Sequence, residues 1–174
     1  MCCPLRSDGA SGSHGFEEGD RMKIMDILVR ESVVVELEST TKDGVLAELT
    51  DAVSRARPDL DRDRLLTVLQ EREALQSTGI GEGVAIPHGK LPGIEGMVAS
   101  FGRSTGGVDF DSIDGEPTRL FFLLVVPEHS GGQHLKALAR ISRFCRDASF
   151  RDEMMRAKFP EDIFRALEEE DGRF

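Results

Sequence analysis

The sequence predicts an α/β domain, in which strands alternate with helices along the chain. The most apolar run, Leu120–Val126, has the length of a strand and ends at Pro127, as expected for a strand covered on both faces in the middle of a sheet. Apolar residues recur at helical spacing over 45–53 and again over 135–145. No internal repeat interrupts this alternation.

The first half of the chain carries clear start and stop signals. Val33–Leu37 is rich in β-branched residues and predicts the first strand. One of the hydroxyl residues in 39–41 can cap the following helix, which Pro58 stops. Asp61 can cap a second helix, whose C-terminal end includes Arg72.

The second half is predicted in the same way. Residues 98–102 alternate weakly and predict a strand, and Gly106–Gly107 and Asp114–Gly115 are typical of turns. After Leu120–Val126, a loop leads to a helix with His134 in its first turn. Ser149 can cap another helix, and Pro160 suits the first turn of the last one.

Composition limits the classes of function. The chain has 174 residues, 39% hydrophobic and 31% charged, as expected for one globular domain. A net charge of −10 argues against nucleic-acid binding, and no apolar run is long enough to cross a bilayer. The three cysteines have neither a disulfide framework nor zinc-ligand spacing, which indicates a reducing cytoplasm.

The first 21 residues differ from the rest. They are rich in Gly, Ser and charged residues and show no apolar periodicity, so we expect 1–21 to be a disordered N-terminal tail. They also lack the apolar segment of a signal peptide. The folded domain is therefore predicted to span 22–174, with Met22 as a possible natural start.

The segment 77–90 is the best candidate for a functional site. A glycine-rich turn leads into a short strand, Val84–Ile86, which Pro87 ends, and the chain is expected to turn at His88. Gly89 has no Cβ, so a partner or a phosphate could approach the imidazole closely. A neutral imidazole nitrogen is a competent nucleophile, and histidine changes its charge near neutral pH.

Several motifs resemble one known family when they are taken together. Arg72–Glu73 and the segment 77–90 resemble the phosphohistidine segment of the enzyme IIA domains of the bacterial phosphotransferase system. The similarity is to the fructose/mannitol type, and best to its nitrogen-related regulatory branch. It continues through Phe110–Gly115, Leu120–Pro127 and Gln133–Leu135, and it covers about 22–167.

The resemblance implies a fold and a mechanism. The fold would be a three-layer α/β/α sandwich with a small mixed β-sheet flanked by helices. A histidine phosphocarrier protein resembling HPr would hand a phosphoryl group to His88, usually to Nε2 in this family, without a nucleotide, metal or other cofactor. Arg72 and His134 would stabilise the charge on the phosphoryl oxygens.

Simpler interpretations compete for the same residues. Arg72 could only complement a helix C-terminus, and His134 could be an ordinary polar residue in a first turn. A zinc site of His88, His129 and His134 with a nearby carboxylate is disfavoured, because His129 and His134 lack one-turn spacing and no Cys or Asp lies at ligand spacing near His88. We expect His129 to lie on the surface. A P-loop would require Gly-Lys-Ser/Thr opening a helix, whereas these glycines open a strand.

Two functions of different classes remain after the resemblance is named. The protein could regulate partner proteins through its phosphorylation state, or it could pass the phosphoryl group to a IIB domain during sugar uptake. The chain to Phe174 has no IIB or IIC segment, and its glycine-rich turn is more similar to the regulatory branch, which favours regulation. A binding module without phosphotransfer is a third possibility, but the presence of His88, Arg72 and His134 together speaks against it.

Overall fold

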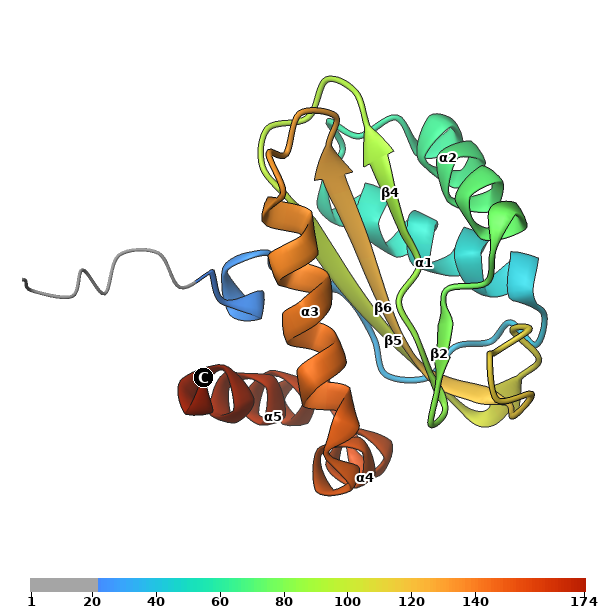
Figure 1. Cartoon of the computed structure of the whole chain (residues 1–174), viewed down its shortest axis with the longest axis vertical. Coiled ribbons are helices and arrows are strands. Elements are labelled where there is room, and N and C mark those ends of the chain that lie inside the picture. Colours follow the sequence, from blue (N-terminus) through green and yellow to red (C-terminus); the bar gives the residue numbers. More distant parts are fainter. Residues whose placement is uncertain (1–21) are drawn as a thin grey trace, which may run out of the picture.

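The structure, a computed structural model, is a mixed six-stranded sheet with helices on both faces (Figure 1). It describes residues 22–174, so the predicted tail 1–21 lies outside the described residues. The predicted α/β class with a mixed sheet between helical layers is confirmed.

The sheet combines parallel and antiparallel neighbours. Its order is β1-β5-β6-β3-β2, and β4 also pairs with β6. β6 is antiparallel to β5 and parallel to β3 and β4, and β1 is parallel to β5. The strands are β1 (Leu28–Val34), β2 (Gly79–Gly81), β3 (Val84–Ala85), β4 (His88–Leu91), β5 (Val98–Val108) and β6 (Thr118–Pro127).

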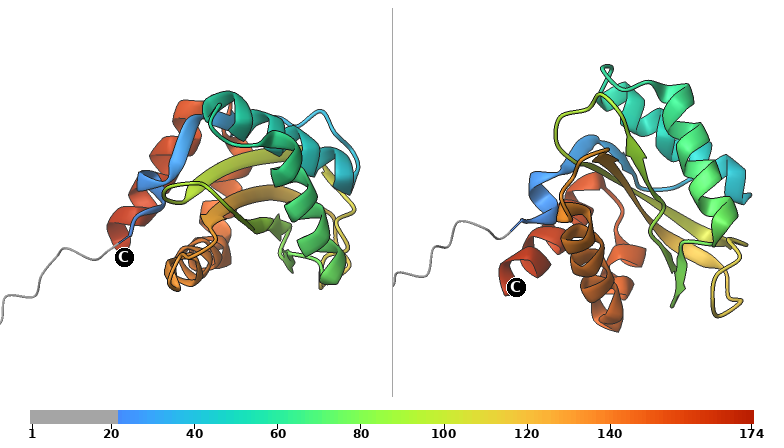
Figure 2. Two further views of the ribbon diagram at one scale, coloured as in Figure 1. Left: turned by 90° about the horizontal axis from the view of Figure 1, so that it is seen from above. Right: turned by 45° about the horizontal axis from the view of Figure 1, so that its top comes forward.

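Two groups of helices cover the sheet. α1 and α2 lie over one face, and α3, α4 and α5 lie over the other (Figures 1 and 2). A short 3₁₀ helix, η2, precedes β1. The helices are η2 (Ile24–Asp26), α1 (Lys42–Ala56), α2 (Arg62–Leu75), α3 (Gln133–Arg146), α4 (Ala148–Arg156) and α5 (Pro160–Arg173).

β6 belongs to both hydrophobic cores. Successive side chains of a strand point to opposite faces, so an entirely apolar strand fits only between two covered faces. Phe122 and Leu124 pack into the core under α3, α4 and α5, whereas Phe121 and Leu123 pack into the core under α1 and α2. The prediction that Leu120–Val126 is a central strand is confirmed.

Several predicted helix signals are confirmed. Thr41 caps α1 by accepting a hydrogen bond from the Gly44 amide, and Asp61 caps α2. Pro160 occupies the first turn of α5. The predicted cap of α4 is wrong by two residues, because Asp147 is the cap and accepts hydrogen bonds from both the amide and the hydroxyl of Ser149.

Two strand predictions need correction. The first strand is Leu28–Val34 rather than Val33–Leu37, because its bounds follow from pairing with β5, with an irregularity between Leu28 and Val33. Gly106–Gly107 lies inside β5 and does not form the expected turn. Gly107 has a φ of +77° next to a register shift in the β5–β6 ladder, so the glycine accommodates a bulge within a continuing strand.

α2 packs directly on β4 at a glycine. A Cβ added to Gly89 would lie 2.7 Å from Cγ1 of Val68, which is closer than two carbon atoms can approach. Residues four apart lie on the same face of a helix, so Arg72 follows Val68 one turn further along α2. This close contact places the C-terminal end of α2 beside the start of β4.

We expect Gly89→Ala to destabilise the protein by about 1 to 3 kcal/mol through overpacking against Val68. Val68→Ala removes the atom that a new Cβ would meet, so the double variant should lose less stability than the sum of the single changes. Chemical denaturation of the four proteins measures the free energies of unfolding. Strict additivity would show that α2 does not press on β4 at this point.

Candidate functional site

His88 begins a strand and does not occupy a turn. Pro87 has no amide proton, but its carbonyl accepts a hydrogen bond from the Leu124 amide of β6 at 2.9 Å. His88 is then aligned with Leu124, and β4 continues along β6. The expected turn at His88 is therefore wrong, because pairing with β6 keeps the chain extended beyond the proline.

The imidazole of His88 has a defined tautomer. Its Nδ1 lies 2.8 Å from the carbonyl oxygen of Ile86, and the ring is half-buried. A carbonyl oxygen can only accept a hydrogen bond, so Nδ1 carries the proton in the neutral ring. The lone pair is therefore on Nε2, which is the nitrogen available to attack an electrophile.

The surroundings of His88 favour the neutral ring. Burial lowers the pKa of His88 most, and the positive charges of Arg72 and His134 lower it further. The hydrogen bond to Ile86 and the negative charge of Glu73 act in the opposite direction, but the net pKa is lowered. His88 therefore holds an uncharged, nucleophilic nitrogen near neutral pH, close to the guanidinium of Arg72 and the imidazole of His134.

The three predicted site residues come from three different elements. His88 starts β4, Arg72 lies in the last turn of α2, and His134 lies in the first turn of α3. Gly89 faces α2, and Ile86 packs into the core under α3, so the alternation along the strand directs His88 toward the α3 face. The site therefore lies where β4 is flanked by helices of both layers.

Arg72 makes the contact expected of a cation at a helix end. Its guanidinium donates a hydrogen bond to the carbonyl of Gln76, the C-cap of α2, at 3.0 Å. This bond uses one nitrogen of the planar group and leaves other donors for a ligand. One guanidinium nitrogen of Arg72 thus does complement the end of α2, as the simpler interpretation expected. The same hydrogen bond orients the guanidinium, whose positive charge lowers the pKa of His88.

His134 is oriented by a residue that the sequence analysis did not single out. The Oγ of Ser130, in the loop before α3, lies 2.8 Å from Nδ1 of His134. This contact engages one ring nitrogen and leaves Nε2 free. A serine four residues before a candidate histidine in a loop gives only a weak signal in the sequence.

Glu73 is the most informative residue that the sequence analysis left without a role. Its carboxylate is buried and accepts hydrogen bonds from the amide and the hydroxyl of Thr78, at 2.9 and 2.5 Å. It continues the buried stripe of α2 formed by Leu65 and Leu69, at a spacing of four residues. A charged residue on an apolar stripe is the signal that could have identified it.

The run Phe110–Gly115 supports the glycine-rich segment from one side. The Phe110 carbonyl accepts a hydrogen bond from the Ser77 hydroxyl at 2.7 Å, and the Ser112 hydroxyl accepts one from the Gly81 amide at 3.1 Å. Asp114 accepts a hydrogen bond from the Glu82 amide at 2.9 Å. This part of the motif therefore holds the β2–β3 hairpin in place and contributes no reactive group.

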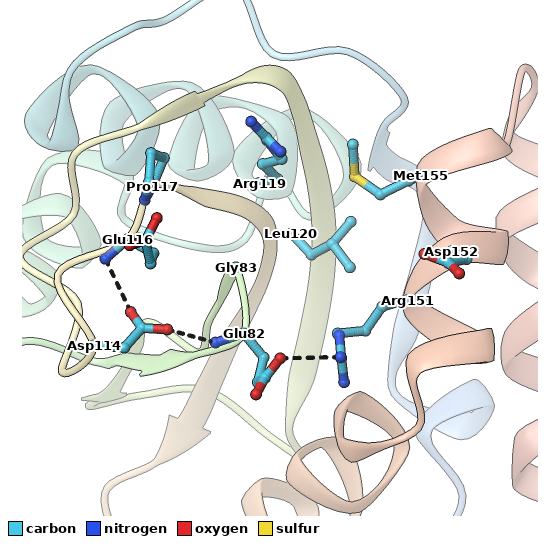
Figure 3. Close-up of a pocket in the computed structure, with 10 residues that line it drawn as sticks. All are labelled: Glu82, Gly83, Asp114, Glu116, Pro117, Arg119, Leu120, Arg151, Asp152 and Met155. Carbon is cyan, nitrogen blue, oxygen red and sulfur yellow. Dashed lines mark hydrogen bonds and ion pairs between the residues drawn. The ribbon is translucent and has the colours of Figure 1, made fainter.

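A separate hollow of about 360 Å³ lies between that hairpin and α4 (Figure 3). Glu82 and Arg151 form an ion pair across it at 3.1 Å, and Asp114 binds the backbone at its edge. None of the three candidate site residues lines this hollow. The Glu82–Arg151 pair and the Asp114 contacts hold the hairpin and α4 together here, so we assign these three residues a structural role.

The remaining candidates have simple outcomes. His129 is exposed, as predicted. Across residues 22–174, no group of three or more His, Cys, Asp or Glu side chains is arranged to hold a metal ion. Within the same residues, no helix is long and apolar enough to cross a membrane.

The chain is similar to proteins of one family. The sequence pattern described as "Phosphoenolpyruvate-dependent sugar phosphotransferase system, EIIA 2" matches residues 26–170. A nitrogen regulatory protein of Bradyrhizobium diazoefficiens is 38% identical over 146 residues, which cover 84% of this chain and 95% of the relative. A fructose-specific EIIABC component of Bacillus subtilis is 33% identical over 150 residues, which cover 86% of this chain but 24% of that protein.

A solved structure is similar in both sequence and fold. The crystal structure of the nitrogen regulatory protein IIA-Ntr from Neisseria meningitidis superposes with a TM-score of 0.78 at 33% identity. The superposition covers 83% of this chain and 98% of that chain. The relatives thus include proteins named for nitrogen regulation and a protein named for fructose transport.

We expect nuclear magnetic resonance to detect the state of His88 directly. The 15N shifts should show a protonated Nδ1 and an unprotonated Nε2 at neutral pH, because Nδ1 donates to Ile86. A pH titration should give a midpoint below the value of about 6.5 for an unperturbed histidine. Arg72→Met, which removes a nearby positive charge, should raise that midpoint. A protonated Nε2 would contradict the assignment of the nucleophilic nitrogen.

Proposed function

Because the chain belongs to the EIIA type-2 family of the phosphoenolpyruvate-dependent sugar phosphotransferase system, we propose that it accepts a phosphoryl group on His88 and regulates partner proteins through its phosphorylation state. The protein is a phosphotransferase of the kind that works through a phosphohistidine. The assignment to His88 rests on one observation: its Nδ1 is engaged by a carbonyl, which leaves a nucleophilic Nε2 close to Arg72 and His134.

The proposed donor is a phosphohistidine on an HPr-like phosphocarrier protein. The lone pair of His88 Nε2 attacks phosphorus in line, the bond between phosphorus and the donor nitrogen breaks, and its electron pair returns to the donor imidazole. No other co-reactant is required. Catalysis then consists of alignment and stabilisation of charge on the equatorial phosphoryl oxygens.

Arg72 and His134 are proposed to provide that stabilisation. Arg72 retains donors beyond the one that binds Gln76, and its planar group can engage two phosphoryl oxygens. His134 offers its second ring nitrogen from the other side of β4, since Ser130 engages the first. A group held between α2 and α3 would thus be bound from two directions.

Exposed apolar side chains lie close to Arg72 and His134 in the sequence. Leu75, three residues after Arg72, is 84% exposed, and Leu135, which follows His134, is 61% exposed. Exposed apolar groups around a site favour docking of another protein over binding of a small polar substrate. Because we propose a phosphocarrier of the cytoplasm as the donor, we also propose that this protein acts in the cytoplasm.

Transfer to a IIB domain during fructose or mannitol uptake is the alternative function. The fructose-specific relative, 33% identical, supports it. Regulation is favoured because the nitrogen regulatory relative is 38% identical and the similar solved structure is also that of a nitrogen regulatory protein. The two functions predict different acceptors. Loss of the phosphoryl group to purified IIB domains would support sugar transport, and binding of a regulatory protein that depends on phosphorylation would support regulation.

We expect His88→Ala to abolish phosphorylation. The wild-type protein, incubated with phosphoenolpyruvate and the phosphocarrier system of the same cell, should gain one acid-labile phosphoryl group by intact-mass measurement. The exposed His129 provides the matched control, and His129→Ala should label normally. Continued labelling of His88→Ala, or an acid-stable label on Ser or Thr, would contradict the assignment.

We expect Arg72→Ala to slow phosphotransfer roughly a hundred- to a thousandfold, in line with loss of one oxyanion donor. If Arg72 only complemented the end of α2, its removal would cost about 0.3 to 1 kcal/mol of stability and leave the rate nearly unchanged. Arg72→Lys keeps the charge but loses the planar group, so it should recover only part of the rate. Rapid-quench labelling measures the rates, and Arg64→Ala, at an exposed position of the same helix, is the control.

A further inference from the structure

We propose that Glu73 is a positioning residue for His88. Its buried carboxylate, paired with Lys42, holds Thr78. The backbone of Thr78 in turn binds that of Ile86, whose carbonyl orients the imidazole. This inference rests on the proposed function, because it assigns a role to Glu73 in phosphotransfer at His88. It concerns a side chain that would not touch the phosphoryl group.

Both carboxylate oxygens of Glu73 accept hydrogen bonds inside the protein. Glu73 is only 6% exposed, and both oxygens bind Thr78, one through the amide and one through the hydroxyl. Lys42 Nζ of α1 lies 3.0 Å from Glu73 Oε1 and also 3.1 Å from Asp111. An unpaired buried carboxylate would be costly, so the lysine and the Thr78 donors together allow a charge to persist there.

Lys42 is held firmly in its charged form. Partial burial opposes its charge, but the hydrogen bonds to Glu73 and Asp111 outweigh burial and raise the pKa of Lys42. Its ammonium group also lies 5.0 Å from the centre of the Phe110 ring. Lys42 therefore joins α1 to the buried Glu73 carboxylate at the end of α2 and to the segment 110–111.

The hydrogen bonds continue from this charge to the imidazole. The carbonyl of Thr78 accepts a hydrogen bond from the Ile86 amide at 3.0 Å, and the carbonyl of the same Ile86 accepts one from His88 Nδ1 at 2.8 Å. Each peptide group in such a chain polarises the next. Displacement of Thr78 would therefore move the acceptor that selects the tautomer of His88.

Glu73 also acts on His88 through space. Its negative charge raises the pKa of His88, against the larger effect of burial and the charges of Arg72 and His134. These are the charged groups that act on the ring from α2 and α3. Glu73 thus has two effects on the acceptor, one through bonded contacts and one through its charge, and both can be measured.

The test compares Glu73→Gln with a matched control, Glu170→Gln. Glu170 is also a buried carboxylate, but it lies in α5 and pairs with Arg173. Each variant is studied as the full chain, by rapid-quench labelling with the phosphocarrier donor and by NMR titration of His88. We expect Glu73→Gln to lower kcat roughly ten- to a hundredfold, the range for a reacting group slightly misplaced, with KM for the donor within about twofold.

The NMR readout does not depend on activity. Glu73→Gln should shift the titration midpoint of His88 to lower pH and increase the fraction of the Nε2-protonated tautomer, whereas Glu170→Gln should change neither. If Glu73→Gln fails to fold, Thr78→Val removes the hydroxyl donor with little change in shape and should have the same effects on kcat and tautomer. A wild-type kcat together with an unchanged His88 tautomer in the variant that folds would overturn the proposal.

Failure of this proposal differs from failure of the proposed function. If His88→Ala still accepts phosphate, His88 is not the acceptor, whatever Glu73 does. If His88→Ala is inactive while Glu73→Gln transfers at the wild-type rate with unaltered His88 signals, the function holds and Glu73 only clamps α2 to the segment 77–78.

Discussion

The fold depends on the burial of β6 on both faces. Its side chains alternate between two cores, so the strand cannot be stable unless helices cover it on each side. β5 pairs with one edge of β6, and β3 and β4 pair with the other edge. α2 and α3 pack over opposite faces of the same sheet (Figures 1 and 2). The elements that carry the candidate site are therefore all positioned by pairing with β6 or by packing against its sheet.

The break at Pro87 gives the site its chemistry. Proline donates no hydrogen bond, so the ladder is interrupted between β3 and β4, yet β6 holds the chain on both sides of the gap. Within this interruption the carbonyl of Ile86 is free to accept from the imidazole of His88. The same backbone that ends one strand thus selects the reactive nitrogen, without any additional side chain at that point.

Electrostatics and packing cooperate at the acceptor. Burial keeps the imidazole neutral, and the nearby charges of Arg72 and His134 favour the same state while remaining suited to a phosphoryl group. Arg72 is available because α2 ends here, and His134 because α3 begins here. Glu73, one residue from Arg72, points instead into the protein and joins the end of α2 to the strand segment that carries His88.

The sequence by itself determined the α/β class, the central strand and the caps of α1 and α2, because apolar periodicity and capping residues are local patterns. The three candidate site residues came from the resemblance of its motifs to a known family. The local patterns misplaced the first strand and the turn at His88, since strand bounds are decided by partners distant in sequence, β5 and β6. Only the tertiary structure decided the tautomer of His88, the contact of Ser130 with His134 and the burial of Glu73. Each of these depends on a particular atom being brought within hydrogen-bond distance by the packing of helices and strands, which no local pattern specifies.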